Sequence, residues 1–398
     1  MSTSNAPLWT PPDDARTRTE MGRFMAEVAR THTSSPDAEA AWADWHAWSV
    51  HDREAFWGAL WRWVEVIADE QPGGDPWDAA LIGRARVAPP DPVLGPLWFE
   101  GARLNFAENL LRRRDDGVAI IFRDERAPSR RLSWGELHDE VAAVAASLRA
   151  IGIVAGDRVA GFLPNIPEAV IAMLAAASIG AVWSSCSPDF GVNGVLDRFA
   201  QIEPRVLFCA DGYRYAGKEI DCLQRVRDIV DAIPSVERVV VVPLLRETPD
   251  LGVVPRAVTW TEFESAGRGV PLVFERLPFS HPLYIMYSSG TTGLPKCMVH
   301  GAGGTLLQHL KEHRLHLDLQ RDERLFYFTT CGWMMWNWLV SALAAQATIV
   351  LYDGAPATPA NASVLWDLAA EEQVTVFGAS AKFLALSEKA GLAPARTH

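Results

Sequence analysis

The architecture of the chain follows from DRVAGFLPNIPEAVIAMLAAASIGAVWSSC, which runs from Asp157 to Cys186. Residues 157–163 and 181–186 are short apolar runs of strand length, and residues 167–177 form an apolar run of helix length that begins with proline. Proline suits the first turn of a helix because its missing N–H has no partner there in any case. The pattern predicts a buried helix between two strands of a parallel sheet.

The same alternation extends in both directions along the chain. Before and after this unit we expect strands at 117–123, 205–210 and 236–242 and helices at 133–150, 193–202 and 218–233. Ser133 and Glu136 have the spacing of a capping box, which marks the start of the first of these helices. A second series has strands at 283–287, 325–329, 347–352 and 374–377 and helices at 304–315, 333–344 and 362–371. The alternation predicts a layered α/β fold with mostly parallel sheets flanked by helices.

Composition divides the chain into three expected parts. Residues 1–100 form a Trp-rich segment with helical spacing, residues 101–270 a first α/β subdomain, and residues 271–398 a second α/β subdomain. The last part ends after a helix without a closing strand. We therefore expect the second subdomain to be incomplete.

Charge and cysteine usage exclude several classes of function. The chain has 398 residues and a net charge of −12, so a general affinity for nucleic acid is not expected. An apolar run at 169–183 has 15 residues, which is too short to span a bilayer, and the N-terminus lacks the pattern of a secretory signal. Five cysteines without a C-x-x-C pair indicate free thiols. These features predict a cytoplasmic protein without membrane insertion.

A run of hydroxyl and glycine residues, YSSGTTGLPK at 287–296, is suited to binding phosphate. Its glycines expose backbone N–H groups, its hydroxyls donate hydrogen bonds, and its lysine adds a positive charge. A plain hairpin turn is disfavoured because such turns need only about two residues. A P-loop ATPase is also disfavoured, since Pro295 and Cys297 stand where that loop has Gly and Ser or Thr.

This run resembles the signature of the adenylate-forming enzymes, which include acyl-CoA synthetases, luciferases and the adenylation domains of peptide synthetases. WFEGARLNFAEN at 98–109 is similar to a segment of the acetyl-CoA synthetase branch. The runs LHLDL at 315–319 and TTCGWMMWN at 329–337 resemble the acetoacetate–CoA ligases of that branch. The resemblance implies the large N-terminal domain of an adenylate-forming enzyme, preceded by a helical segment.

The resemblance also implies a two-step reaction with acetoacetate, ATP, Mg²⁺ and coenzyme A. The acid attacks the α-phosphate of ATP to form acyl-AMP and pyrophosphate, and the CoA thiol then displaces AMP. The residues implied to hold the ATP phosphates are Ser288, Ser289, Gly290, Thr291, Thr292, Gly293 and Lys296. Thr291, Thr292 and Lys296 are the implied catalytic groups, since this step requires positioning and charge stabilisation rather than a base.

Two further subsites are implied by the resemblance. The acid is expected to contact Trp333, Met334, Met335, Trp336 and Asn337, although such a run at a helix start also suits a core. Asn337 is the one amide among them, and we expect it to donate to a β-keto oxygen. Phosphate groups of CoA are expected at a helix start that carries Arg214, Ala216, Gly217 and Lys218; a solvated helix start is the alternative.

Four histidines, His300, His309, His313 and His316, lie on or just before one expected helix. The spacing raises the possibility of a metal site, but the sequence supplies no evident carboxylate partner. We expect a helix face whose histidines are satisfied by hydrogen bonds, and no metal site.

Motifs that the family places further along have no counterpart before His398: the adenine motif, the ribose-binding Asp, the hinge and the mobile C-terminal domain with its adenylation Lys. The chain is therefore expected to be truncated and to lack parts needed for full turnover. Two alternatives remain open. One is a ligase for acetate, propionate or butyrate, and the other is an inactive nucleotide-binding fragment. The oligomeric state is left undetermined.

Overall fold

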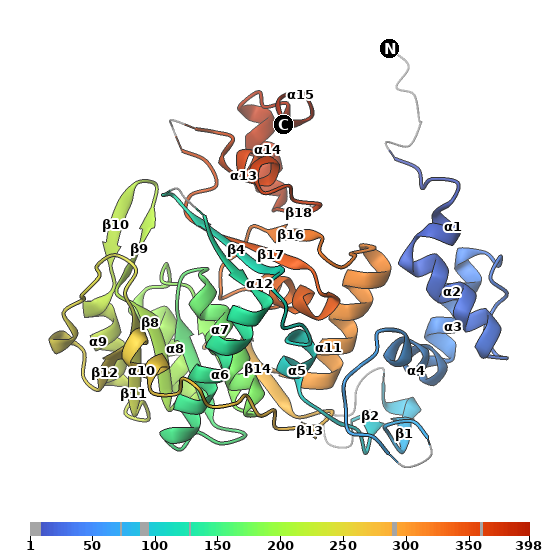
Figure 1. Cartoon of the computed structure of the whole chain (residues 1–398), viewed down its shortest axis with the longest axis horizontal. Coiled ribbons are helices and arrows are strands. Elements are labelled where there is room, and N and C mark those ends of the chain that lie inside the picture. The colour runs from blue at the N-terminus through green and yellow to red at the C-terminus, as the bar shows by residue number, and fades with distance from the viewer. Residues whose placement is uncertain (1–8, 72–73, 88–94, 127–128, 289–292, 359–360) are drawn as a thin grey trace.

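Two sheets with helices between and outside them form the body of the protein (Figure 1). The computed structural model describes residues 9–71, 74–87, 95–126, 129–288, 293–358 and 361–398. The larger sheet has seven strands in the order β12 (Ala257–Thr259), β11 (Arg238–Val242), β8 (Val206–Ala210), β6 (Arg158–Phe162), β7 (Val182–Cys186), β14 (Pro282–Ser288) and β15 (Lys296–Gly301). All neighbours are parallel except β14 and β15.

The smaller sheet has five strands, in the order β18 (Val376–Gly378), β16 (Arg324–Tyr327), β17 (Thr348–Asp353), β4 (Val118–Asp124) and β5 (Arg130–Ser133). Only β4 and β5 pair antiparallel. Both sheets draw strands from either side of residue 270, where the sequence pattern suggested a subdomain boundary. The described residues also form three two-stranded pairs: β1 (Ala79–Ile82) with β2 (Leu97–Glu100), β3 (Arg103–Leu104) with β13 (Leu277–Pro278), and β9 (Gly212–Tyr215) with β10 (Lys218–Asp221).

Helices α6 (Trp134–Ala150) and α7 (Pro167–Ser178) lie between the sheets. Every residue of α7 is buried, as expected for a helix that is apolar on all sides. Successive side chains of β11 point to opposite faces of the larger sheet. Val240 and Val242 pack in the core between the sheets, and Val239 and Val241 pack in the core on the outer face of the larger sheet. The predicted capping box of Ser133 and Glu136 is confirmed.

Other helices cover the outer faces of the two sheets. Helices α8 (Val192–Ile202) and α9 (Leu223–Ala232) pack on the larger sheet, and α13 (Val364–Glu371) and α14 (Ala381–Lys389) pack on the smaller one. The predicted layered, mostly parallel α/β fold is therefore confirmed. The remaining helices are α5 (Phe106–Leu110), α10 (Trp260–Ser265), α11 (Ala302–Leu310), α12 (Met334–Ser341) and α15 (Pro394–Thr397). A π-helical segment spans Lys311–His316, and 3₁₀ turns lie at Arg84–Arg86, Leu251–Val253 and Ala342–Ala345.

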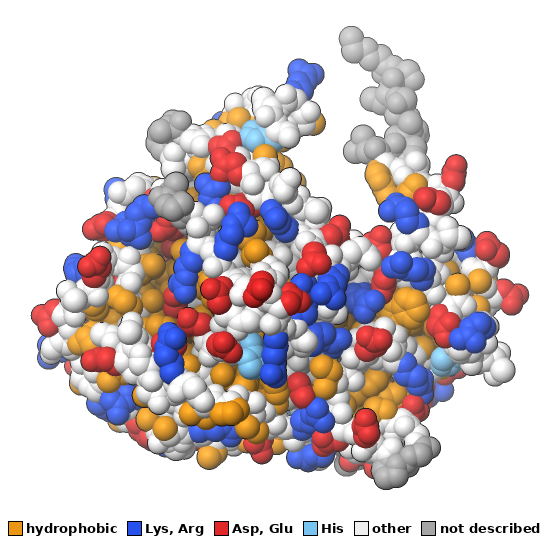
Figure 2. Space-filling view, viewed as in Figure 1, with side chains coloured by type: hydrophobic (Ala, Val, Ile, Leu, Met, Phe, Trp, Pro, Cys, Tyr) orange, Lys and Arg blue, Asp and Glu red, His pale blue; other side chains and the backbone are white. Residues whose placement is uncertain are grey.

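The N-terminal part contains four helices, α1 (Ala15–Arg18), α2 (Glu20–Thr31), α3 (Trp42–His51) and α4 (Arg53–Trp63). Figure 2 shows basic side chains gathered along the boundary between these helices and the main body. A groove of about 910 Å³ at this boundary is lined by Arg23, Arg62, Arg314 and Arg321 together with Glu20, Glu27 and Glu65. Glu20 is buried and accepts hydrogen bonds from both Arg23 and Arg314. These charged side chains therefore hold α2 against the π-helical segment of the main body.

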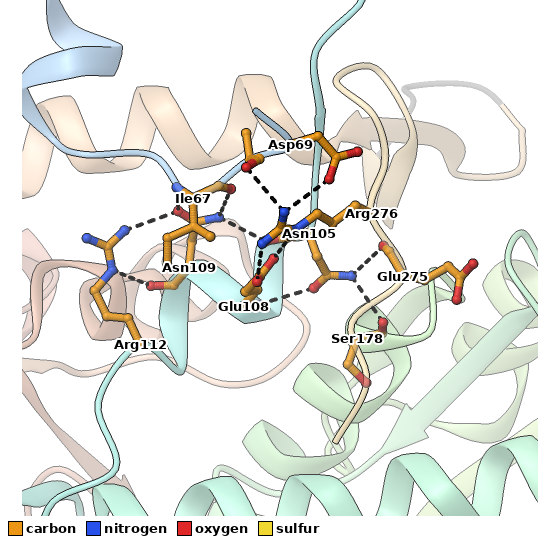
Figure 3. Close-up of polar contacts among 10 residues, drawn as sticks. Ile67, Asp69, Asn105, Glu108, Asn109, Arg112, Ser178, Glu275 and Arg276 are labelled. Carbon is orange, nitrogen blue, oxygen red and sulfur yellow. Dashed lines mark hydrogen bonds and ion pairs between the residues drawn. The ribbon is translucent and has the colours of Figure 1, made fainter. Parts of the chain in front are cut away.

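Asparagines of α5 join this N-terminal part to the body (Figure 3). The N–H of Ile67 donates to Asn109 Oδ1 at 2.8 Å, and Asn109 Nδ2 donates to the carbonyl oxygen of Ile67 at 3.0 Å. The side-chain amide thus makes the two hydrogen bonds that a neighbouring strand would make. Nearby, Arg276 forms ion pairs with Glu108 and Asp69, at 2.6 and 3.0 Å. The segment that resembled the acetyl-CoA synthetase branch is thus a structural junction. No helix in the described part of the chain has the length and apolar character required to cross a membrane.

Candidate active site

Strands β14 and β15 carry the two ends of the run that we expect to bind phosphate, at 287–296. They pair antiparallel with Ser288 opposite Lys296, so Tyr287 and Ser288 end β14 and Lys296 begins β15. Ser289, Gly290, Thr291 and Thr292 lie outside the described residues. Gly293 has φ of 100°, a backbone conformation that glycine adopts readily and other residues rarely do.

Lys296 is exposed at the start of β15. The structure shows no hydrogen bond or ion pair between its ammonium group and the described residues. Beside it, Gln201 of α8 donates to the carbonyl oxygen of Pro295 at 2.9 Å and thereby fixes the base of the loop. Lys296 could therefore bind an anion without first breaking an ion pair with a carboxylate of the described residues.

The expected acid-binding run begins α12, as predicted, but its members differ in accessibility. Trp333 is 62% exposed, whereas Trp336 is fully buried and Asn337 is 3% exposed. Met334 and Met335 are partly buried. The structure therefore leaves Trp333, Met334 and Met335 reachable, and it places Trp336 and Asn337 in the interior.

The amide of Asn337 links α12 to the strand that leads into the phosphate loop. Its Nδ2 lies 3.5 Å from the sulfur of Met286 in β14, and its Oδ1 is buried without a partner among the described residues. Asn337 also lines a cavity of about 10 Å³ together with Ser184, Ser185 and Tyr287. That volume suits one water molecule, so an acid would need the cavity to widen before it could contact the amide.

Trp336 is held by a polar residue that the sequence analysis did not single out. Its Nε1 donates to Asn165 Oδ1 at 2.9 Å. The backbone N–H of Asn165 donates to Asp353 at 3.2 Å, and its side-chain amide reaches the carbonyl oxygen of Tyr352 at 3.3 Å. Asn165 follows β6 and Asp353 ends β17, so this network ties α12 to the carboxyl ends of strands from both sheets.

We expect Trp336→Phe to lower the free energy of unfolding by about 2 kcal/mol, because Asn165 loses a buried donor and the smaller ring leaves a void. Trp333→Phe, at an exposed position of the same helix start, should change it by less than about 0.5 kcal/mol. Urea denaturation of both variants measures the difference. Equal effects would contradict the interior role of Trp336.

The basic segment expected to bind CoA does not open a helix. Residues 212–221 form the β9–β10 hairpin, and α9 begins only at Leu223, so the expected helix at 218–233 was wrong in its first part. Ala216 and Gly217 form the tip of the hairpin, and Arg214 is ion-paired with Glu219. The alternating residues of 212–215 and 218–221 pair in register, which satisfies their backbone groups as strands before any helix can form.

The histidines divide into two groups. His309 and His313 are buried, and both contact the hydroxyl of Ser341 in α12, at 2.9 and 3.0 Å. His313 also contacts the carbonyl oxygen of Trp338 at 3.0 Å. His316, in contrast, is exposed. The expectation of histidines satisfied by hydrogen bonds holds only in part for this buried pair, because Nδ1 of His313 is buried without a partner among the described residues.

Sequence reasoning missed three positions that contact expected site residues: Asn165 binds Trp336, Gln201 binds Pro295, and the carboxylate of Glu125 accepts from the N–H groups of Ala216 and Gly217. Asn165 had a usable signal, since a polar residue between Pro164 and Pro167 follows a buried strand, where ligand sites of α/β sheets gather. Gln201 and Glu125 carry no comparable local signal, because their partners lie far away in the sequence.

The fold and the hairpin agree with a match to a family of known proteins. The sequence profile described as AMP-binding enzyme matches residues 106–394. The chain belongs to the AMP-binding enzyme family.

Within that family, the chain is similar to acetoacetyl-CoA synthetases. It is 50% identical over 394 residues to the acetoacetyl-coenzyme A synthetase of Rhizobium meliloti, a match that covers 98% of this chain and 58% of the relative. It is 46% identical to the acetoacetyl-CoA synthetase of Mus musculus, covering 98% and 57%. The solved structure of acetoacetyl-CoA synthetase from Streptomyces lividans superposes with a TM-score of 0.89 at 43% identity, covering 98% of this chain and 58% of that one. The chain thus spans somewhat more than half the length of these relatives.

Proposed function

We propose that this chain forms the part of an acid–CoA ligase that binds acetoacetate and the phosphates of ATP. The full reaction converts acetoacetate, ATP and CoA to acetoacetyl-CoA, AMP and pyrophosphate through an acyl-adenylate. The observation that carries the proposal is the contact between Met286 in the phosphate-loop strand and Asn337 in α12, which brings the two expected subsites together. The printed names of the relatives support the choice of acid.

The chemistry requires these groups to be adjacent. A carboxylate is already a nucleophile, so the first step depends on holding it in line with the α-phosphate and on stabilising phosphate charge. Lys296 supplies a positive charge on a flexible stem, and Ser288 supplies a hydroxyl at the opposite strand end. We propose that Mg²⁺ reaches the site bound to the phosphates of ATP.

Acetoacetate-dependent ATP–pyrophosphate exchange tests the proposed function, because it isolates adenylation from thioester formation. We expect exchange at least about tenfold faster with acetoacetate than with acetate or butyrate, which corresponds to about 1.4 kcal/mol of discrimination. An intact acetoacetyl-CoA synthetase serves as the positive control. Faster exchange with acetate or butyrate would favour the other short-chain acids, and no exchange by folded chain would favour the inactive nucleotide-binding fragment.

Lys296→Ala should weaken binding of MgATP or pyrophosphate about tenfold, since one charge-assisted contact to phosphate is lost. Isothermal titration calorimetry measures the change in affinity. Lys389→Ala removes an exposed lysine at the end of α14 and is the matched control. An unchanged affinity in the Lys296 variant would remove this residue from the site.

We further propose that Asn337 distinguishes acetoacetate from butyrate once the cavity beside it opens. Its Nδ2 supports this, because it makes only long contacts of 3.5 Å with Met286 and Trp333 and can donate to the β-keto oxygen that butyrate lacks. The exchange assay on Asn337→Ala compares the two acids directly.

We also propose a cytoplasmic location, in keeping with five free cysteines, four of them buried.

A further inference from the structure

A cavity with an aromatic lining lies between the N-terminal helices and the main body, and it shares no residue with the candidate active site. Its volume is about 310 Å³, which is in the range of small-molecule pockets. Residues of α2, α3 and α4, which Figure 1 shows grouped at one side of the main body, line it together with the π-helical segment. Six rings of Phe and Trp and two methionines give the lining its apolar character.

Four of these rings pack edge to face in succession. The ring centroids of Trp45 and Trp48 are 5.6 Å apart, and those of Trp48 and Phe56 are 5.9 Å apart. The centroids of Phe56 and Trp57 are 5.2 Å apart, and the interplanar angles of the three pairs run from 75° to 87°. Because these rings already serve one another as partners, the wall suits a slender alkyl chain better than a further aromatic ring. The two methionines are flexible and can adapt to such a chain.

Lys311 of the π-helical segment gives this cavity a positive charge. Its Nζ lies 5.8 Å from the centroid of the Trp57 ring, and burial lowers the pKa of its ammonium group because the surrounding side chains displace water. Lys311 forms no ion pair with the described residues. The carboxylate oxygens of the neighbouring Glu312 accept instead from Gln308 and Trp338, at 2.7 and 2.8 Å. Among the described residues that line the cavity there is no Asp or Glu, so an anion would meet no like charge.

Two hydrogen-bond donors in the wall are also without partners. Trp45 is 4% exposed and Trp48 is 6% exposed, and the Nε1 of each is buried without a partner among the described residues. Buried indole N–H groups normally find an acceptor, as Trp63 of α4 does by donating to Glu20 at 2.9 Å. The wall therefore has spare donors that an oxygen of a ligand can satisfy and an alkyl chain cannot.

We propose that this cavity binds the anion of a medium-chain fatty acid, with the carboxylate paired to Lys311 and the alkyl chain among the aromatic rings. A quaternary ammonium ion, which aromatic cages also bind, is disfavoured by the charge of Lys311. The inference is independent of the proposed function, because none of the residues expected to contact acetoacetate, ATP or CoA lines this cavity. A bound acid would hold the N-terminal helices to the main body, since it contacts both.

Isothermal titration calorimetry of the full chain with octanoate tests the ligand class. We expect octanoate to bind about tenfold more tightly than hexanoate, because two further methylene groups are buried. It should bind at least about tenfold more tightly than octylamine, whose charge Lys311 repels. Octylamine that binds as tightly as octanoate would overturn the choice of an anion.

Variants of Lys311 test the position of the carboxylate. Lys311→Met keeps a flexible apolar side chain without the charge and should weaken octanoate binding at least about tenfold. Lys311→Arg keeps the charge and should bind octanoate within about threefold of the wild type. Lys389→Ala is the matched control at an exposed lysine. Unchanged affinity in Lys311→Met would overturn the proposal, and displacement by acetoacetate would then assign the octanoate to the acid-binding site.

Amide hydrogen exchange locates the bound acid. Saturating octanoate should slow exchange at least about twofold both in α3, at residues 42–51, and in the π-helical segment, at residues 311–316, because the ligand contacts both. Helix α9, which packs on the outer face of the larger sheet, is the internal control and should not change. Slower exchange that is confined to other segments would overturn the assignment of octanoate to this cavity.

Discussion

Asn105→Ala is expected to destabilise the protein by about 3 kcal/mol. Asn105 is 3% exposed, and its Nδ2 donates to the carbonyl oxygens of Ala177, Ser178 and Glu275 at 3.0, 3.1 and 2.8 Å. Its Oδ1 accepts from the N–H of Glu108 at 3.2 Å and so caps α5. Alanine would leave carbonyl groups at the end of α7 short of a donor and would remove the cap.

Urea denaturation measures this loss directly. Asn193→Ala is the matched control, because Asn193 is exposed on α8 and should tolerate the change within about 0.5 kcal/mol. If Asn105→Ala cost no more than the control, the junction in Figure 3 would contribute little to stability. A large loss would mean that Asn105, in the segment at 98–109 that resembles the acetyl-CoA synthetase branch, holds α5, the end of α7 and residue 275 together.

The elements best predicted from the sequence are those whose own residues determine their burial. The apolar run at 167–177 became α7, with its proline in the first turn, because a helix that is apolar on all sides has one favourable place, between two layers. The capping box at Ser133 was predictable for the same reason, because both of its residues lie within one helical turn of each other. The sheet order could not be obtained in this way, since β14 lies beside β7 although nearly 100 residues separate them.

The candidate site was less predictable for the same reason. The run expected to bind phosphate can be recognised from its own residues. The hairpin at 212–221 cannot, because Ala216 stands where such a turn favours Asn or Gly and its N–H is bound by the distant Glu125. Trp336 and Asn337 were grouped with Trp333 because they are neighbours in sequence. The helical turn then placed them on the inward face, where Asn165 binds one of them.

Acidification should destabilise the protein through the buried pair His309 and His313. Burial lowers the pKa of His309 from 6.5 to about 4 and that of His313 to about 3, because a charged imidazole would lose its hydration. An unfolded chain binds these protons near pH 6.5, whereas the folded chain does not. The contribution of this pair to stability is therefore fully present above about pH 7.5, falls as the pH drops through 6.5 toward the folded-state pKa values, and has decreased by about 5 kcal/mol at pH 4.5.

Chemical denaturation at several pH values, with the free energy of unfolding plotted against pH, measures this dependence. Replacing both histidines by glutamine should lower stability at pH 8, because the contacts with Ser341 are disturbed, but should flatten the slope between pH 6.5 and 4.5. His46→Gln, at an exposed position, should leave the slope unchanged. An equally steep slope in the double variant would assign the acid sensitivity to other groups. A flattened slope would assign the acid sensitivity to these two histidines, whose burial and contacts with Ser341 join α11 and the π-helical segment to α12.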